Sequence, residues 1–193
     1  MHTQRPFILS IDLDYAFSPV IALYDDFIEG SRVSLAEQQA ILERHNAPKP
    51  QLNPAKIQYL QQVFAQAQKE APTIVEACHH HEIVPHLRGD ELQIINIDHH
   101  HDIFYPGWHE SHVLDEGNWI YWLAQRKRLK SYLWIRNDDS EDVDPTVPID
   151  FSYREQAWID PERLPAIELI FLCSSPHWTG VHTLELLKEA NKQ

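Results

Sequence analysis

The chain has 193 residues, 43% of them hydrophobic, and a formal net charge of −13 from 16 Lys and Arg against 29 Asp and Glu. This content is enough for a packed core, so we expect one globular domain over residues 1–193 rather than a disordered chain. The charge argues against nucleic acid or a membrane surface as a partner, because both need a basic face. It favours cationic ligands such as metals, amines and guanidinium groups.

The two cysteines, Cys78 and Cys173, form no Cys-x-x-Cys pair. A disulfide scaffold is therefore not expected, and a cytoplasmic protein fits this cysteine usage. The N-terminal residues show no secretory signal pattern, and the longest apolar runs are of strand length, too short to span a bilayer.

The first elements alternate between strand and helix. Residues 7–14 are an apolar run that predicts a buried strand. A polar helix is expected from about Ser34, where Ser34 and Glu37 fit a capping box, up to a Pro-containing break at 47–50.

Asn53 and Pro54 then fit the N-cap and first residue of a second helix. Two strands follow, over 72–77 and 92–98, and the run His79-His80-His81 lies between them. The second helix is amphipathic, with apolar residues at helical spacing, namely Ile57, Leu60, Val63, Phe64 and Ala67.

Later in the chain, residues 137–165 are acidic and rich in proline, and we expect a long surface excursion there. The whole pattern predicts an α/β fold with three layers, a mostly parallel sheet carrying helices on both faces. The other expected elements are a helix over 116–128 capped by Asp115, strands over 131–136 and 167–173, and a final helix from about Thr179.

Five consecutive Asp and His residues end the strand at 92–98, from Asp98 to Asp102. Alternate residues of an extended chain share a face, so Asp98, His100 and Asp102 are expected to point into one pocket. A solvated loop is the simpler interpretation. However, neighbouring carboxylates repel unless positive charge lies between them, and this favours a bound divalent cation.

Asp12 and Asp14 end the first strand in the same way. Solvated acids at a strand end are the alternative, but Asp12 follows an apolar run and is expected to be partly buried, so it needs a partner such as a metal. One residue of His79-His80-His81 could complete the coordination, or these residues could be exposed at a helix start. Cys78 and Cys173 are interpreted as small buried residues rather than ligands.

These motifs resemble those of the ureohydrolase superfamily, which contains arginase, agmatinase and, more distantly, the histone deacetylases. Residues 98–102 resemble its Asp-x-His-x-Asp motif, and residues 10–14 resemble its Ser-x-Asp-x-Asp motif. A closer resemblance is to a branch whose bacterial members look like peptide arginases. It rests on Val75-Glu76 with His79 or His80, on residues 98–102, and on Asn118-Trp119.

The resemblance covers roughly residues 7–15, 74–136 and 167–180, and it implies two Mn²⁺ ions. Asp98 and Asp12 would bridge them, and Asp14 would also take the proton of the attacking hydroxide and return it to the departing amine. His109 or His112 would shuttle protons. The implied metal ligands are Asp12, Asp14, His80 (or His79), Asp98, His100 and Asp102.

The implied substrate is a ribosomally made precursor peptide, whose arginine side chains are hydrolysed to ornithine and urea during natural-product maturation.

Two departures from ordinary arginases stand out. The Asp-x-Asp strand precedes the Asp-x-His-x-Asp strand, so the strand order looks permuted. The late strand that ends Cys173-Ser174-Ser175 also lacks the Glu that grips the guanidinium.

Three other functions remain open at this point. One is a ureohydrolase of free arginine or agmatine, and another is a deacetylase-like amide hydrolase with one Zn²⁺, which would leave Asp14 and Asp102 without a role. The third is a metal-binding or partner-binding module without activity. The oligomeric state is not fixed, and a homodimer is compatible with the sequence.

Overall fold

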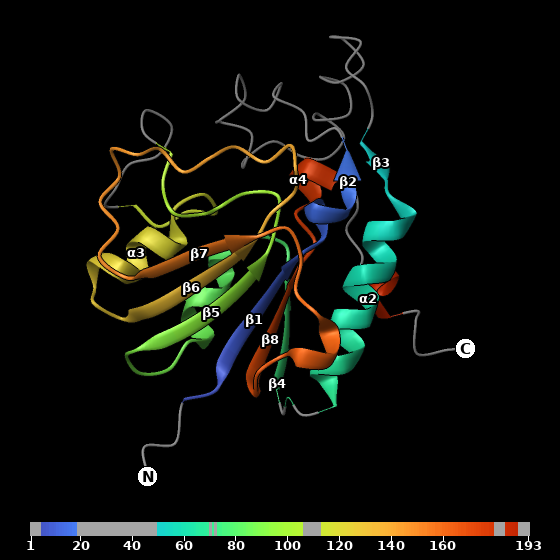
Figure 1. The fold of residues 1–193 in the computed structure, drawn as a ribbon, viewed down its shortest axis with the longest axis horizontal. Helices are drawn as coiled ribbons and strands as arrows, with labels where there is room; N and C mark the ends of the chain where they lie inside the picture. Colours follow the sequence, from blue (N-terminus) through green and yellow to red (C-terminus); the bar gives the residue numbers. More distant parts are fainter. Residues whose placement is uncertain are drawn as a thin grey trace, which may run out of the picture.

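A computed structural model describes residues 5–18, 50–69, 71, 73–105, 113–179 and 184–188. Its centre is a six-stranded sheet in the order β4-β8-β1-β5-β6-β7, and every pairing in this sheet is parallel (Figure 1). A small antiparallel pair, β2 (Phe17–Ser18) and β3 (Gln51–Leu52), lies apart from it. The six strands are β1 (Phe7–Asp12), β4 (Thr73–Ala77), β5 (Leu92–Ile97), β6 (Leu129–Ile135), β7 (Ser152–Gln156) and β8 (Ile167–Cys173).

Alternate residues of the central strands pack into two separate cores. Leu9 and Ile11 belong to one core with the helices α2 (Pro54–Gln68) and α5 (Glu185–Lys188). Ile8 belongs to the other, with the helix α3 (Trp119–Gln125) and the 3-10 helix η3 (His80–His86). Helices therefore cover both faces of the sheet, which gives the three-layer α/β arrangement expected from the sequence.

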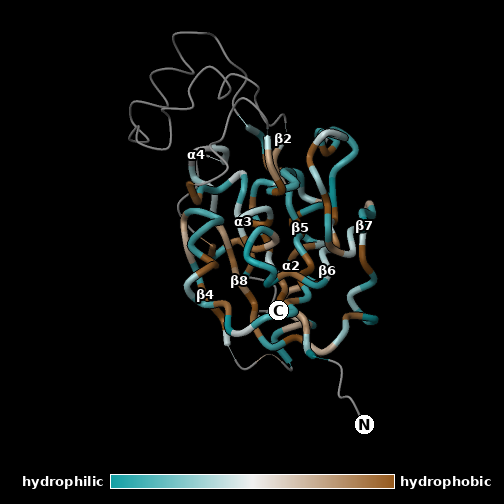
Figure 2. The backbone as a smooth tube through the Cα atoms, turned by 90° about the vertical axis from the view of Figure 1, so that its left-hand side faces the viewer, coloured by the Kyte–Doolittle hydropathy of each residue, from teal (hydrophilic) through white to brown (hydrophobic). Residues whose placement is uncertain are grey.

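Covering both faces explains the composition of the inner strands. A strand that is buried on both sides needs apolar residues at successive positions rather than at alternate ones. Figure 2 shows hydrophobic residues, in brown, along the strands of the sheet. All six residues of β5 are buried.

Helix α2 forms as its sequence predicts. The Asn53 side chain accepts hydrogen bonds from the backbone N–H groups of Ala55 and Lys56, and Pro54 occupies the first turn, where no donor is needed. The five apolar residues at helical spacing are all buried against the sheet. The helix expected from Ser34 starts outside the described residues, which also omit residues 47–49 of the Pro-containing break at 47–50.

The expectation of a surface excursion over 137–165 is wrong in one respect, because β7 lies within it and pairs with β6. β7 is an edge strand with the polar sequence Ser-Tyr-Arg-Glu-Gln and four exposed residues, so it lacks the apolar pattern that marks the inner strands. A polar edge strand is also a common protection against edge-to-edge pairing.

The other differences lie at the ends of elements. The expected helix over 116–128 is shorter: α3 begins at Trp119, with Asn118 as its N-cap. Asp115 instead accepts a hydrogen bond from the Gly117 N–H in the preceding turn. In the described part of the C-terminal region, the helices are α4 (Pro176–Thr179) and α5, and the expected helix start near Thr179 coincides with the end of α4.

The strand order decides where a site can form. β1 lies between β8 and β5, and the chain leaves it towards β4 at one edge before returning to β5 on its other side. Parallel sheets of this kind place ligands at the carboxyl ends of the strands, where the chain changes direction across the sheet. Among the helices of the described residues, none has the length and apolar character needed to cross a membrane.

Candidate metal centre

Three neighbouring parts of the sheet deliver acidic and imidazole side chains to one place. Asp12 is the last residue of β1, and Asp14 lies in the following 3-10 helix η1 (Leu13–Ala16). His80 opens η3 directly after β4, and Asp98 follows β5. All four residues are buried, and each lies at or just beyond the carboxyl end of a parallel strand.

One group of ligand atoms gathers around His80. Its Nδ1 atom lies 2.9 Å from Asp98 Oδ2, 2.9 Å from Asp102 Oδ2 and 3.3 Å from Asp12 Oδ2. A single N–H cannot donate well to three acceptors at once. Atoms that each lie about 2.1 Å from one cation in an octahedral arrangement are about 3 Å apart, so the observed spacing fits a coordination shell.

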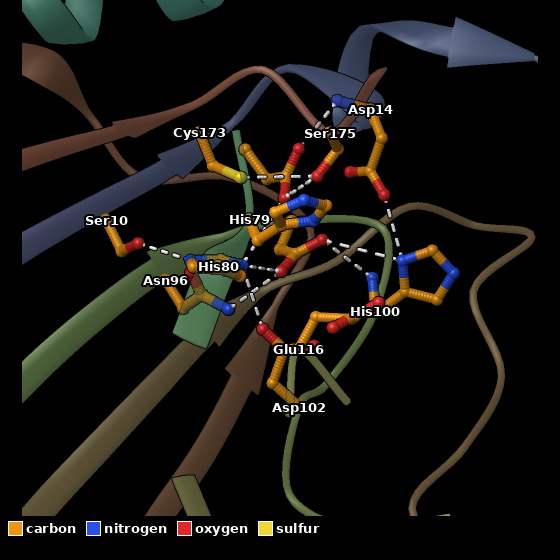
Figure 3. Close-up of polar contacts among 12 residues, drawn as sticks. Ser10, Asp14, His79, His80, Asn96, His100, Asp102, Glu116, Cys173 and Ser175 are labelled. Atoms are coloured by element: carbon orange, nitrogen blue, oxygen red, sulfur yellow. Dashed lines mark hydrogen bonds and ion pairs between the residues drawn. The ribbon is translucent and has the colours of Figure 1, made fainter. Parts of the chain in front are cut away.

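A second group gathers around His100. Its Nδ1 atom lies 2.8 Å from Asp14 Oδ2 and 3.8 Å from Asp98 Oδ1 (Figure 3). Asp12, His80 and Asp98 on one side, and Asp14, Asp98 and His100 on the other, can each hold a metal ion. Asp98 belongs to both, with Oδ2 directed at the His80 group and Oδ1 at the His100 group.

Charge balance gives a reason for a cation in these groups. Asp12, Asp14, Asp98 and Asp102 are each at most 4% exposed at the side chain. Buried charges of one sign are costly unless opposite charge compensates them. Four carboxylates and two neutral imidazoles would be balanced by two divalent cations, so the residues fit such ions.

The pKa values of the metal-free groups reflect the same crowding. Burial, with added repulsion from neighbouring acids, raises the pKa of Asp14 to about 7 and that of Asp98 to about 6. Burial lowers the pKa of His100 while the Asp14 carboxylate raises it, and the net value is about 10. At His80, burial also lowers the pKa, but Asp102, Asp12 and Asp98 raise it by more, so this pKa lies well above its usual value. Without a metal, protons have to take over the balancing role.

Polar residues behind the ligands hold them in place. The Ser10 hydroxyl lies 2.5 Å from His80 Nε2, which leaves Nδ1 directed at the carboxylates. Asn96 Nδ2 donates to Asp98 Oδ2 at 3.1 Å, and the Trp119 indole N–H donates to Asp102 Oδ2 at 2.6 Å. Fixed partners of this kind orient metal ligands and are common in metal sites.

The convergence of Asp98, His100 and Asp102 was predicted, but the reason given for it was wrong. These residues do not continue the strand, because β5 ends at Ile97 and the chain then bends. Asp102 has a φ of 51°, in the left-handed region, so it is not extended. The bends bring the three side chains together where a regular strand would have spread them over more than 13 Å.

The two other histidines of the 98–102 run have different partners. His99 Nδ1 lies 3.2 Å from Asn137 Nδ2, and burial lowers the pKa of His99 to about 4, so this ring is neutral. His101 stacks on the Tyr105 ring at 4.1 Å, and its Nδ1 accepts the Ile103 N–H. Both are packing residues rather than members of the two ligand groups.

The structure also separates the three histidines at 79–81. His80 is the member that reaches the carboxylates. The rings of His79 and His81 stack on each other at a centroid distance of 5.8 Å. His81 also forms an ion pair with Glu116 at 3.4 Å. Burial raises the pKa of Glu116, but the contact with His81 lowers it by more, so that this pKa is about 2. The proposed proton shuttles His109 and His112 lie outside the described residues.

Cys173 is buried as expected, but Cys78 is exposed, so the expectation of burial is wrong for Cys78. Cys78 follows β4 at the sheet edge, where the strand has only one neighbour to cover it.

Four residues of the site were not assigned a supporting role from the sequence: Ser10, Asn96, Trp119 and Ser175. Ser10 and Asn96 did carry a signal, because each is a polar residue within a mostly apolar, buried strand, and the two are register partners across β1 and β5. A buried polar residue needs a partner, and here that partner is a metal-ligand candidate. Ser175 carried no comparable pattern.

Comparison of the chain with protein-family models, with curated proteins and with solved structures finds no match. The resemblance to the ureohydrolases therefore rests on the motif residues alone.

The shared position of Asp98 predicts an unequal effect of two conservative substitutions. Asp98→Asn removes a charged ligand from both groups, so we expect it to abolish tight binding of divalent cations at both. Asp14→Asn affects one group and should leave binding at the other. Metal content after dialysis, measured by elemental analysis, tests this, with Asp150→Asn on the exposed surface as the matched control. Equal metal content in the two site variants would contradict the sharing.

The raised pKa of His100 predicts a pH dependence of the metal-free protein. A group with a raised pKa stabilises the folded state fully below its unfolded value of 6.5, and this contribution is lost as the pH rises through about 10. The urea concentration at the unfolding midpoint of the metal-free protein should therefore decrease when the pH is raised from about 7 to about 9. His100→Gln should flatten this slope, and saturating Mn²⁺ should remove it because bound ligands stay deprotonated. An unchanged slope in His100→Gln would show that other groups cause it.

Proposed function

We propose that this protein is a hydrolase with two Mn²⁺ ions that converts arginine side chains of a peptide to ornithine and releases urea. The observation that carries the proposal is the pair of buried ligand groups that share Asp98, with one carboxylate oxygen directed at each. Two divalent cations in such a site, when bound, polarise the substrate and activate water for attack on an electron-poor carbon. The resemblance to the peptide arginases supplies the substrate class.

The number of ligand groups supports a dinuclear site over a single Zn²⁺ ion. Both groups consist of carboxylates and imidazoles, which can bind Mn²⁺ and Zn²⁺ alike, but the one Zn²⁺ of a deacetylase-like enzyme needs only one such group. Asp14, which is buried, and His100, which is partly exposed, would then form a second closely spaced acid–base pair without a function. The presence of both groups favours the dinuclear site.

Asp14 is the residue that we assign to proton transfer. Its Oδ1 accepts the His99 N–H at 3.3 Å, and its Oδ2 lies next to His100. This carboxylate is held from two sides, so it can present an oxygen at a fixed place beside the reacting groups. Asp12 and Asp98 would hold the ions, while Asp102, fixed by Trp119, would complete the His80 group.

The exposure of the ligands indicates how a substrate reaches them. The His100 side chain is 23% exposed, whereas the other five candidate ligands are at most 4% exposed. The Trp178 ring packs against His100 at a centroid distance of 4.6 Å. A guanidinium that enters past His100 would meet this aromatic ring, and cations bind favourably to the face of Trp.

A peptide presents the arginine side chain with its backbone left outside, where the acidic protein surface attracts neighbouring basic groups. We expect kcat/KM for an arginine-containing peptide to exceed that for free arginine and for agmatine by at least about a hundredfold, or about 2.7 kcal/mol of transition-state stabilisation. Mass spectrometry would detect conversion as a mass loss equal to urea minus water. A free small molecule as the better substrate would instead identify an arginase or agmatinase, and acetyl-lysine hydrolysis would support the deacetylase-like alternative.

The position of Trp178 predicts a specific kinetic effect. Trp178→Leu removes the aromatic face, so we expect KM for the peptide to rise about 5- to 30-fold, as loss of a cation–π contact of about 1–2 kcal/mol implies, while metal content stays unchanged. Trp178→Phe should retain part of the affinity. Trp158→Leu, at a position 61% exposed and outside the site, is the matched control. A KM for Trp178→Leu equal to the wild-type value would remove Trp178 from the substrate path.

A further inference from the structure

Ser175 combines an unusual backbone conformation with a contact to a metal-ligand candidate. It lies two residues beyond the end of β8, and its φ is 40°, in the left-handed region that L-residues rarely adopt. Glycine enters this region without steric cost, and a non-glycine residue held there is under strain. Strain of this kind persists only where the surroundings enforce it, and it is concentrated at functional sites.

The Ser175 hydroxyl donates a hydrogen bond to Asp12 Oδ2 at 2.5 Å, and both residues are buried. The other oxygen of this carboxylate, Oδ1, accepts the Asp14 N–H at 3.0 Å. Asp12 is therefore fixed from two sides, by the backbone after its own strand and by a side chain from the neighbouring strand. Asp12 and Cys173 are register partners across β1 and β8, so the turn after Cys173 carries Ser175 to the carboxylate.

We propose that Ser175 is a positioning residue of the metal centre, which holds the Asp12 carboxylate in the orientation that places Oδ2 beside His80 Nδ1. This inference rests on the metal site of the proposed function. The two atoms lie 3.3 Å apart, as two ligands of one cation would. The strained backbone at Ser175 is retained because a hydroxyl must project from that conformation to reach Asp12, and glycine, which would relieve the strain, has none.

Ser174 is a natural control for this role. It is also buried and directly adjacent, but its hydroxyl lies 3.5 Å from the backbone oxygen of Ala77 rather than near a carboxylate. Ser174→Ala therefore removes a neighbouring buried hydroxyl without changing the contact to Asp12.

Three substitutions at Ser175 distinguish the effect of losing the hydroxyl from the effect of relieving the backbone strain. Ser175→Ala and Ser175→Gly both remove the hydroxyl, but only glycine relieves the strain. Ser175→Thr keeps a hydroxyl and adds a β-branch that suits this conformation poorly. Mn²⁺ affinity is measured by calorimetric titration of the metal-free protein, and stability by urea unfolding in the presence of a chelator.

We expect Mn²⁺ affinity to depend on the presence of the hydroxyl. The alanine and glycine variants should bind Mn²⁺ about 10- to 100-fold more weakly, and the threonine variant should have an affinity closer to that of the wild type. The stability of the metal-free protein should depend on the backbone strain instead, so the glycine variant should be more stable than the alanine variant. Ser174→Ala should bind Mn²⁺ as the wild type does. Should Ser175→Thr not fold, the comparison of the glycine, alanine and wild-type proteins still decides the matter.

Wild-type Mn²⁺ affinity in Ser175→Gly would overturn the inference, because Ser175 would then only form the turn. An equal loss of affinity in Ser174→Ala would also overturn it, since the effect would not depend on the contact to Asp12. If the wild-type protein itself binds no Mn²⁺, the proposed function fails, and this result is distinct from either outcome at Ser175.

Discussion

Four carboxylates are buried within a few ångströms of one another, and the rest of the structure is organised around the resulting negative charge. Their mutual repulsion and their removal from water both oppose folding unless positive charge lies between them. In the metal-free protein this charge has to come from protons, which is why the pKa of Asp14 and Asp98 is raised by burial and by their acidic neighbours. Two divalent cations would supply the same balance without protons, and would leave His80 and His100 neutral as ligands.

The parallel sheet makes this crowding possible. Because neighbouring strands run in one direction, their carboxyl ends meet at the same edge and deliver His80, Asp12, Asp98 and Ser175 from four adjacent strands. The inner strands are covered on both faces, so their backbone is fixed by packing as well as by hydrogen bonds. A rigid edge of this kind supports the short turns that carry the ligands just beyond the ends of the strands.

The same geometry bears on the proposed relation to the ureohydrolases, in which the Asp-x-Asp strand would come first in the chain rather than later. A ligand group depends on which strands are neighbours in space and not on their order in the sequence. Here β1 lies directly beside β5 in parallel register, with Ile11 opposite Ile97. Asp12 and Asp98 therefore leave the sheet side by side, and a permuted order would not prevent a shared metal site.

The sequence by itself determined the α/β class, the helix α2 (Pro54–Gln68) with its N-cap Asn53, most of the inner strands and the acidic and imidazole residues that gather at the strand ends. These features depend on local patterns of apolar residues and caps, which the chain carries at each position. Only the tertiary structure selected His80 from three adjacent histidines, set His99 and His101 apart from the ligands, and gave Ser10, Asn96, Trp119 and Ser175 their supporting roles. It also revealed the polar segment β7, which is a strand only because it pairs with β6. The reason is that these roles depend on bends such as that at Asp102 and on contacts between residues as far apart as Asp12 and Ser175, which local sequence patterns do not encode.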